Sequence, residues 1–141
     1  MKYRKEIMSR EFTKHLLDFK SKNSSLHLVI HHFKGPDKGG PHDHPFRFRT
    51  HILKGSYTER VYFHAPDGQW SFEDIERKAD TTHVVEAECI HEIIHLPEGD
   101  CWTVIQPEQK VREPGFWRFK PDGIWFRQWN GKWQPFVGAE V

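Results

Sequence analysis

The sequence predicts an all-β fold, a small antiparallel β-barrel preceded by one short helix. Short runs of β-branched and aromatic residues recur along the 141-residue chain. Gly, Pro, Asn and Asp separate these runs at intervals of roughly 8–12 residues, which is typical of a β-sandwich or barrel. In addition, 11 Phe, 6 Trp and 3 Tyr give one core many large side chains to bury.

Length and charge narrow the class of protein. A chain of 141 residues predicts one domain over residues 1–141. Lys and Arg total 21 against 20 Asp and Glu, so the overall basic bias of a nucleic-acid-binding domain is absent. No run approaches the ~20 apolar residues of a membrane span, and the charged N-terminus lacks a signal-peptide pattern. We therefore expect a cytoplasmic protein with neither nucleic acid nor membrane as partner.

The elements are expected in the following order. Apolar residues near helical spacing predict an N-terminal helix within residues 1–20: Ile7, Met8, Phe12, Leu16 and Phe19. A barrel core should then occupy residues 26–106, with strands at 26–33, 46–53, 57–64, 69–72, 82–85, 89–96 and 101–106. Residues 116–136 should add C-terminal strands. There Asn130-Gly131 predicts a hairpin, because this pair favours the positive φ angles of a type I′ turn.

The two cysteines are expected to be reduced. If strands 89–96 and 101–106 pair as a hairpin, His95 faces Cys101 and Cys89 lies six residues further along its strand. At ~3.3 Å per residue the two sulfurs are then roughly 20 Å apart, beyond disulfide reach. Free thiols fit a reducing compartment.

Histidine is the compositional outlier, with 11 in the chain. Most are scattered, but His42 and His44 lie close together in the segment Gly-Gly-Pro-His-Asp-His-Pro at residues 39–45. On a strand, residues two apart point to one face, so both imidazoles can reach a single metal ion at ~2.0–2.2 Å. This pair is the main candidate for chemistry.

Gly40, His42, His44 and Gly55 match, in order and approximate spacing, the first motif of the cupin superfamily. The glutamate of that motif is absent, and Phe48 stands in its place. The sequence resembles this family over residues 42–106, which implies a jelly-roll barrel that binds one divalent metal.

In the second cupin motif, a third histidine follows a Pro-x-Gly step. Here His91 occupies that position without the Pro-x-Gly. The resemblance then implies a neutral three-histidine metal site made by His42, His44 and His91, of the kind that thiol dioxygenases in the family use around iron(II). We expect Fe(II), with Zn, Ni or Mn as alternatives. His51 and His95 are substitutes for His91. By strict alternation, His95 shares the face of His91, whereas His51 lies opposite His42 and His44.

Two other functions remain open. The His pair followed by Leu-Lys-Gly-Ser-Tyr at residues 53–57 also resembles the cupin-fold sugar-nucleotide ketoisomerases, in which two histidines act as acid and base without a metal. His42, His44 and Tyr57 are the candidate catalytic residues, with Tyr62 as an alternative to Tyr57. The third function is a non-catalytic barrel that binds a small molecule.

Further residues are candidates for substrate contact. Arg47 and Arg49 flank the His pair, and a guanidinium binds phosphate or carboxylate through two hydrogen bonds. Cys101 can approach the metal from the hairpin partner strand. The expected partners are a small-molecule ligand and a second copy of the chain, since the Trp residues suit a barrel wall or an oligomer interface. No phosphate-binding Gly loop, Cys-x-x-Cys pair or Gly-x-Ser-x-Gly motif is present.

Overall fold

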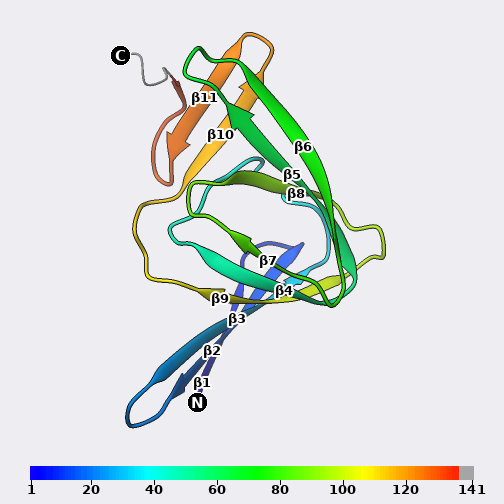
Figure 1. The fold of residues 1–141 in the computed structure, drawn as a ribbon, viewed down its shortest axis with the longest axis vertical. Helices are drawn as coiled ribbons and strands as arrows, with labels where there is room; N and C mark the ends of the chain where they lie inside the picture. The colour runs from blue at the N-terminus through cyan, green and yellow to red at the C-terminus, as the bar shows by residue number, and fades with distance from the viewer. Residues whose placement is uncertain (137–141) are drawn as a thin grey trace.

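The computed structural model describes residues 1–136, which form β-strands and no helix (Figure 1). None of these residues forms a helix that could cross a membrane. The strands are, in chain order, β1 (Lys2–Ile7), β2 (Phe12–Lys20), β3 (Ser25–Phe33), β4 (Phe48–Lys54), β5 (Ser56–His64), β6 (Trp70–Lys78), β7 (Thr82–Val85), β8 (Ile90–His95), β9 (Cys101–Pro107), β10 (Gly115–Lys120), β11 (Gly123–Gln128) and β12 (Gln134–Pro135).

The strands form three antiparallel sheets. The largest has the order β1-β2-β3-β9-β4-β7, the second β6-β5-β8 and the third β10-β11-β12. Single bridges join His42, which lies outside these strands, to His91 on β8 and to Phe116 on β10. The predicted all-β, antiparallel class is confirmed. Among residues 1–136, however, strand pairing leaves separate sheets rather than one closed hydrogen-bonded ring.

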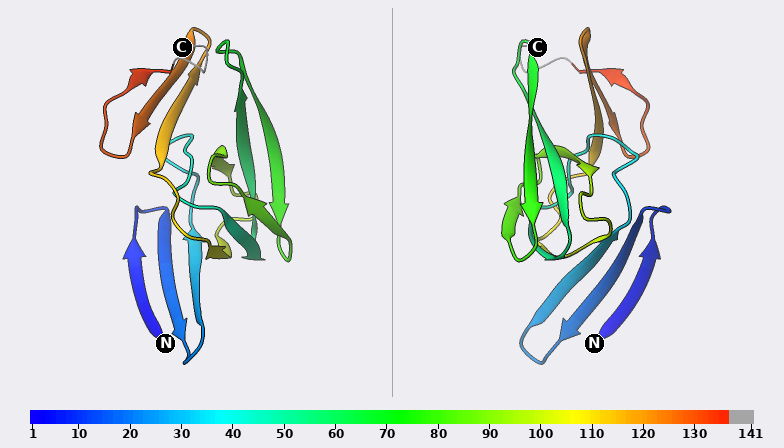
Figure 2. Two further views of the ribbon diagram at one scale, coloured as in Figure 1. Left: turned by 60° about the vertical axis from the view of Figure 1, so that its left-hand side comes forward. Right: turned by 90° about the vertical axis from the view of Figure 1, so that its right-hand side faces the viewer.

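The predicted N-terminal helix is wrong. β1 and β2 pair as an antiparallel hairpin, from Lys2 opposite Asp18 to Ile7 opposite Thr13. This hairpin, blue in Figure 1, extends from one end of the molecule, and Figure 2 shows it continuing the large sheet through β3. The side chains that suggested helical spacing belong to two strands and the turn between them.

The predicted hairpin of residues 89–96 with 101–106 is also wrong. β8 pairs with β5 in the second sheet, whereas β9 lies between β3 and β4 in the first. The connecting turn, closed by the Gly99 N–H donating to the Leu96 carbonyl at 3.2 Å, therefore crosses between sheets. Cys89 and Cys101 are free thiols.

The C-terminal hairpin forms, but the predicted type I′ turn is wrong, because neither Asn130 nor Gly131 has a positive φ and the loop that joins β11 to β12 runs from residue 129 to 133. β11 pairs with β12 through Trp125 opposite Pro135 and Phe126 opposite Gln134. The Gly131 N–H donates to the Gln128 carbonyl at 2.9 Å, so the Asn-Gly pair lies in the connecting turn.

The core lies between the six-stranded sheet and the β6-β5-β8 sheet. One buried cluster takes one side chain from each of five strands, β3, β4, β5, β8 and β9. Its members are Phe33, Ile52, Tyr57, Ile93 and Cys101. A second cluster, Val29, Phe48, Val85 and Ile105, lies further along the first sheet. A third, around Trp117, packs β10 and β11 against β8. Between these clusters remains the cavity on which the histidines converge.

Gly55 joins β4 to β5, and its backbone explains the glycine of the motif. Its φ is +81°, in the left-handed region that side chains disfavour. A Cβ there would lie 2.6 Å from the Asp100 carbonyl oxygen. Only glycine fits this tight turn beside the β8–β9 connection.

Candidate metal centre

Three histidines converge at one place. His42, His44 and His91 each present a ring nitrogen, and these nitrogens all lie within 4.8 Å of one another. The Nε2 atoms of His44 and His91 are 2.9 Å apart. His44 is 8% and His91 7% exposed. The expected trio is therefore brought together, from a loop and from β8.

His42 and His44 do not lie on a strand, contrary to the sequence prediction. Their loop precedes β4 and is held by backbone hydrogen bonds instead. The His42 N–H donates to the His91 carbonyl at 2.9 Å, and the His91 N–H donates back at 3.0 Å. The His44 N–H donates to the Ala87 carbonyl at 2.9 Å. These bonds place both loop histidines beside His91.

Hydrogen bonds on the far side of two rings fix their orientation. The His42 Nδ1 is 3.0 Å from the Gly40 carbonyl oxygen, and the His91 Nδ1 is 2.5 Å from Glu59 Oε2. Both partners can only accept, so each Nδ1 carries the proton. Each Nε2 atom then carries a lone pair rather than a proton, which is the arrangement of metal-bound histidines.

Glu59, on β5, was not identified from the sequence. It is 1% exposed, and its Oε1 accepts from Arg77 at 3.1 and 2.9 Å. Burial raises the pKa of this carboxyl, but the hydrogen bonds and charges of His91 and Arg77 outweigh burial and lower it to about 2. One feature of the sequence points to Glu59: it lies two positions after Tyr57, so a charged residue falls on the inward face of the strand.

Asp43, between the two loop histidines, also escaped the sequence analysis. It is 3% exposed. Its carboxylate accepts from the Gly115 N–H at 2.6 Å and the Trp117 Nε1–H at 3.1 Å, and it pairs with Arg112 at 3.1 Å. Asp43 therefore anchors the histidine loop to the start of β10.

The rings of His42 and His44 are held neutral. Burial lowers the pKa of His44 to about 2, and the nearby charges of His91, His42 and Arg112 add to the effect. Burial, followed by the charge of His91, also lowers the pKa of His42. Neutral imidazole is the form that binds metal.

The geometry fits a single ion. Two nitrogens bound at ~2.1 Å and about 90° apart are about 3.0 Å from each other, close to the observed 2.9 Å between the His44 and His91 Nε2 atoms. Without an ion, that contact needs a proton from His44, which leaves its buried Nδ1 as an acceptor without a partner. An ion between the rings would take the Nε2 lone pairs of both rings in place of that contact. Three neutral imidazoles suit Fe, Ni or Zn.

The triad opens on a cavity of about 430 Å³ between the sheets. Most of its walls are apolar, with Phe46, Phe48 and Phe116 among the lining side chains. Tyr57 also lines it, and its hydroxyl lies 3.4 Å from His83 Nε2. Burial raises the pKa of Tyr57 well above its usual value, so the phenol is neutral. The volume is that of a small-molecule site.

The remaining candidates do not line this cavity. Arg47 binds Glu86 at 3.0 Å and Glu108 at 2.6 Å on the surface. Arg49 is exposed on the opposite face of β4 from Phe48. Cys101 is buried in the Phe33 cluster, where burial raises the pKa of its thiol to about 11.

Neither substitute histidine reaches the triad. The Nδ1 of His51 is 2.7 Å from Thr82 Oγ1, on the outer face of the large sheet. His95 is exposed at the end of β8, beyond a register shift in its pairing with β5.

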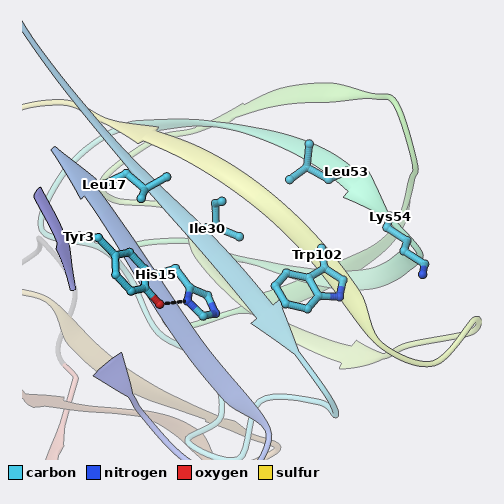
Figure 3. Close-up of a pocket in the computed structure, with 7 residues that line it drawn as sticks. All are labelled: Tyr3, His15, Leu17, Ile30, Leu53, Lys54 and Trp102. Carbon is cyan, nitrogen blue, oxygen red and sulfur yellow. Dashed lines mark hydrogen bonds between the residues drawn. The ribbon is translucent and has the colours of Figure 1, made fainter. Parts of the chain in front are cut away.

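A second hollow lies on the outer face of the large sheet, away from the triad. Figure 3 shows its mostly apolar lining: Tyr3, His15, Leu17, Ile30, Leu53, Lys54 and Trp102. The Tyr3 hydroxyl is 2.7 Å from His15 Nδ1. Along β2 and β3 these residues alternate with those that line the inner cavity, so the two hollows occupy opposite faces.

Solved structures with a similar fold are known. The hydroxypropylphosphonic acid epoxidase from S. wedmorenis aligns with a TM-score of 0.56 at 9% identity over 75% of this chain and 55% of its own. A structure described as FeII HppE gives 0.56 at 12% identity over 75% and 56%. The Momordica charantia 7S globulin gives 0.58 at 13% identity over 92% and 36%.

These neighbours are cupin-fold proteins, and this chain shares their fold. The chain spans about half the length of the first of them. No protein-family model matches the sequence, and no curated protein is similar to it. The likeness shows the fold alone, because one fold hosts many functions.

Proposed function

We propose that His42, His44 and His91 bind one divalent metal ion, with Fe(II) favoured over Zn, Ni or Mn, and that the protein is a dioxygenase-like oxidoreductase acting on a small molecule in the cavity. The observation that carries this proposal is the triad, with His44 and His91 buried and three ring nitrogens within 4.8 Å of one another. The FeII form of one structural neighbour supports the choice of metal.

The chain's own residues have distinct parts in this proposal. When bound, an iron(II) ion supplies open positions for dioxygen and substrate. Glu59 keeps the proton of His91 on Nδ1 and fixes the plane of that ring. The Phe side chains around the cavity exclude water. Tyr57 supplies a neutral hydroxyl that can hold or donate a proton to the ligand.

Oxygen uptake tests this function. Chelator-treated protein, reloaded with Fe(II), would be incubated with a panel of small organic acids in an oxygen electrode. We expect uptake that needs both iron and one member of the panel, and that is lost in His44→Ala. The control, His15→Ala, changes a ring in the outer hollow and should retain uptake.

The same experiment separates the alternatives. A substrate that is converted in the presence of chelator, with loss of conversion in His44→Ala, would instead support a metal-independent sugar-nucleotide ketoisomerase or epimerase. The acid and base would then be neutral His42 and His44. A small molecule that stays bound and leaves chemically unchanged would support a binding protein.

A further inference from the structure

One row of polar side chains crosses the large sheet on its cavity face. Lys14 on β2 lies directly opposite His31 on β3, and His31 lies directly opposite Thr103 on β9. All three line the cavity. Because cross-strand neighbours on one face lie about 5 Å apart, these groups form a continuous polar strip.

The strip has apolar neighbours on both sides. The row on one side is Phe12 and Phe33, and the row on the other is Leu16, Val29 and Ile105. Polar groups between apolar rows are costly unless something binds them.

Among residues 1–136, these three groups have no hydrogen-bond partner, although the Lys14 Nζ lies 5.7 Å from the centre of the Phe12 ring. Thr103 is 1% exposed, and its Oγ1 is buried without a hydrogen-bond partner. The Nε2 of His31 is likewise buried and unpartnered. Lys14 has no ion pair or hydrogen bond within the described residues, although Glu6 faces it from β1. Buried polar groups without partners in a cavity point to a ligand that supplies them.

We propose that Lys14, His31 and Thr103 form an oxyanion subsite on the cavity wall formed by the large sheet, and that the ligand carries a carboxylate or phosphoryl group. An ammonium, a ring N–H and a hydroxyl are all donors, and an oxyanion is the acceptor that can use them together. The inference rests on the proposed function, because it names the substrate class for the same cavity.

The charges around the cavity favour an anionic group of the ligand bound beside Lys14. Burial, followed by the charge of Lys14, lowers the pKa of His31 to about 3, so its ring is neutral and its single proton can be donated. Burial also lowers the pKa of Lys14, an effect that a bound anion would reverse. Asp37 lines the cavity and acts on the charge of His42. An anionic group is therefore repelled from Asp37 and drawn toward Lys14.

Binding of simple probes tests the subsite. Metal-free, isotope-labelled protein would be titrated with acetate, glycolate, inorganic phosphate and methylphosphonate, with acetamide as the uncharged counterpart. We expect the backbone amide signals of Lys14, His31 and Thr103 to shift with the anions and not with acetamide. Whichever series binds more tightly, the carboxylates or the phosphoryl compounds, identifies the anionic group of the ligand.

Two variants and one control locate the charge that binds. Lys14→Met should weaken anion binding by about tenfold or more, because it removes a charged hydrogen-bond donor. Thr103→Val, of nearly equal volume, should weaken it about threefold. Lys20→Met removes the same charge from the exposed end of β2 and should leave binding unchanged.

Equal binding of anions and acetamide, no binding of any anion, or unchanged binding in Lys14→Met would overturn the subsite. Because the probes are used without metal, the result is independent of the metal proposal. Lys14-dependent anion binding in a protein that takes up no metal would uphold the subsite and contradict the proposed function. Metal uptake by a protein that shows no Lys14-dependent anion binding would agree with the proposed function and overturn the subsite.

Discussion

Glu59 is the single residue outside the triad on which the metal centre depends most directly. Glu59→Gln keeps the size of the side chain but removes the charge that holds the Nδ1 proton of His91. We expect metal affinity to fall about 10–100-fold, as for other carboxylates behind metal-bound histidines. Competition with a chromophoric chelator measures this. Glu92→Gln, which changes a carboxylate bound by Tyr62 instead, is the matched control. Equal affinity in wild type and Glu59→Gln would contradict this role.

Individual site residues differed in how well the sequence predicted them. The His42 and His44 pair is local in sequence, and the resemblance to a known motif added His91. Glu59 and Asp43 act through contacts that close only in the folded chain. Glu59 reaches His91 through the pairing of β5 with β8, and Asp43 reaches Gly115 from 72 positions away. No spacing along the sequence encodes such contacts.

The loop that carries His42 and His44 depends on Asp43 for its attachment to β10. Asp43→Asn removes a buried charge and replaces one acceptor oxygen by an amide that cannot accept from Gly115 or Trp117. We expect the free energy of unfolding to fall by about 1–3 kcal/mol. Urea denaturation of metal-free protein measures this. Asp122→Asn, in an exposed turn, should have no effect. Equal losses in both variants would show that the anchor is unimportant.

The β1–β2 hairpin shows why one element was mispredicted. Phe12 and Leu16 are four residues apart, which fits one face of a helix and also one face of a strand. Lys14 lies between them on the same strand face, and because it is polar the sequence does not show the alternation of apolar and polar residues that is typical of a strand. In the structure Lys14 faces the cavity together with Phe12 and lies opposite His31. The residue that broke the local pattern is thus the one assigned a binding role.

For the whole molecule, buried neutral histidines predict sensitivity to acid. Burial lowers the pKa of His31 to about 3 and that of His83 to about 4, while Lys14 and Arg77 add their charges. An unfolded histidine titrates near 6.5, so as the pH falls below that value the unfolded chain takes up protons first. Stability is therefore complete above about pH 6.5 and is lost progressively toward pH 4.

Urea unfolding of metal-free protein at pH 7, 6 and 5 measures this loss. Each such histidine contributes up to about 1.4 kcal/mol per pH unit to the slope. His31→Gln should flatten the slope by up to that amount. A free energy of unfolding that is constant between pH 7 and 5, or a slope unchanged in His31→Gln, would contradict the prediction.

The outer face of the large sheet predicts a homodimer. Tyr3, Phe19, Leu26, Leu53 and Val84 are exposed large apolar side chains on its strands. A second copy presents the same apolar face, and a net charge of +1 gives little repulsion between copies. We expect sedimentation to give twice the 16.9 kDa chain mass. Leu53→Glu should yield monomers, whereas Phe63→Glu, equally exposed on β5, should not. A monomeric wild type would contradict this arrangement.

The metal content of untagged protein decides whether His42, His44 and His91 bind an ion. Chelator-treated protein would be incubated anaerobically with Fe(II), freed of unbound metal and analysed by mass spectrometry for iron per chain. We expect one ion per chain in wild type and in His15→Ala, and none in His44→Ala. Wild-type protein that retains no more iron than His44→Ala would contradict the assignment of His42, His44 and His91 as a metal centre.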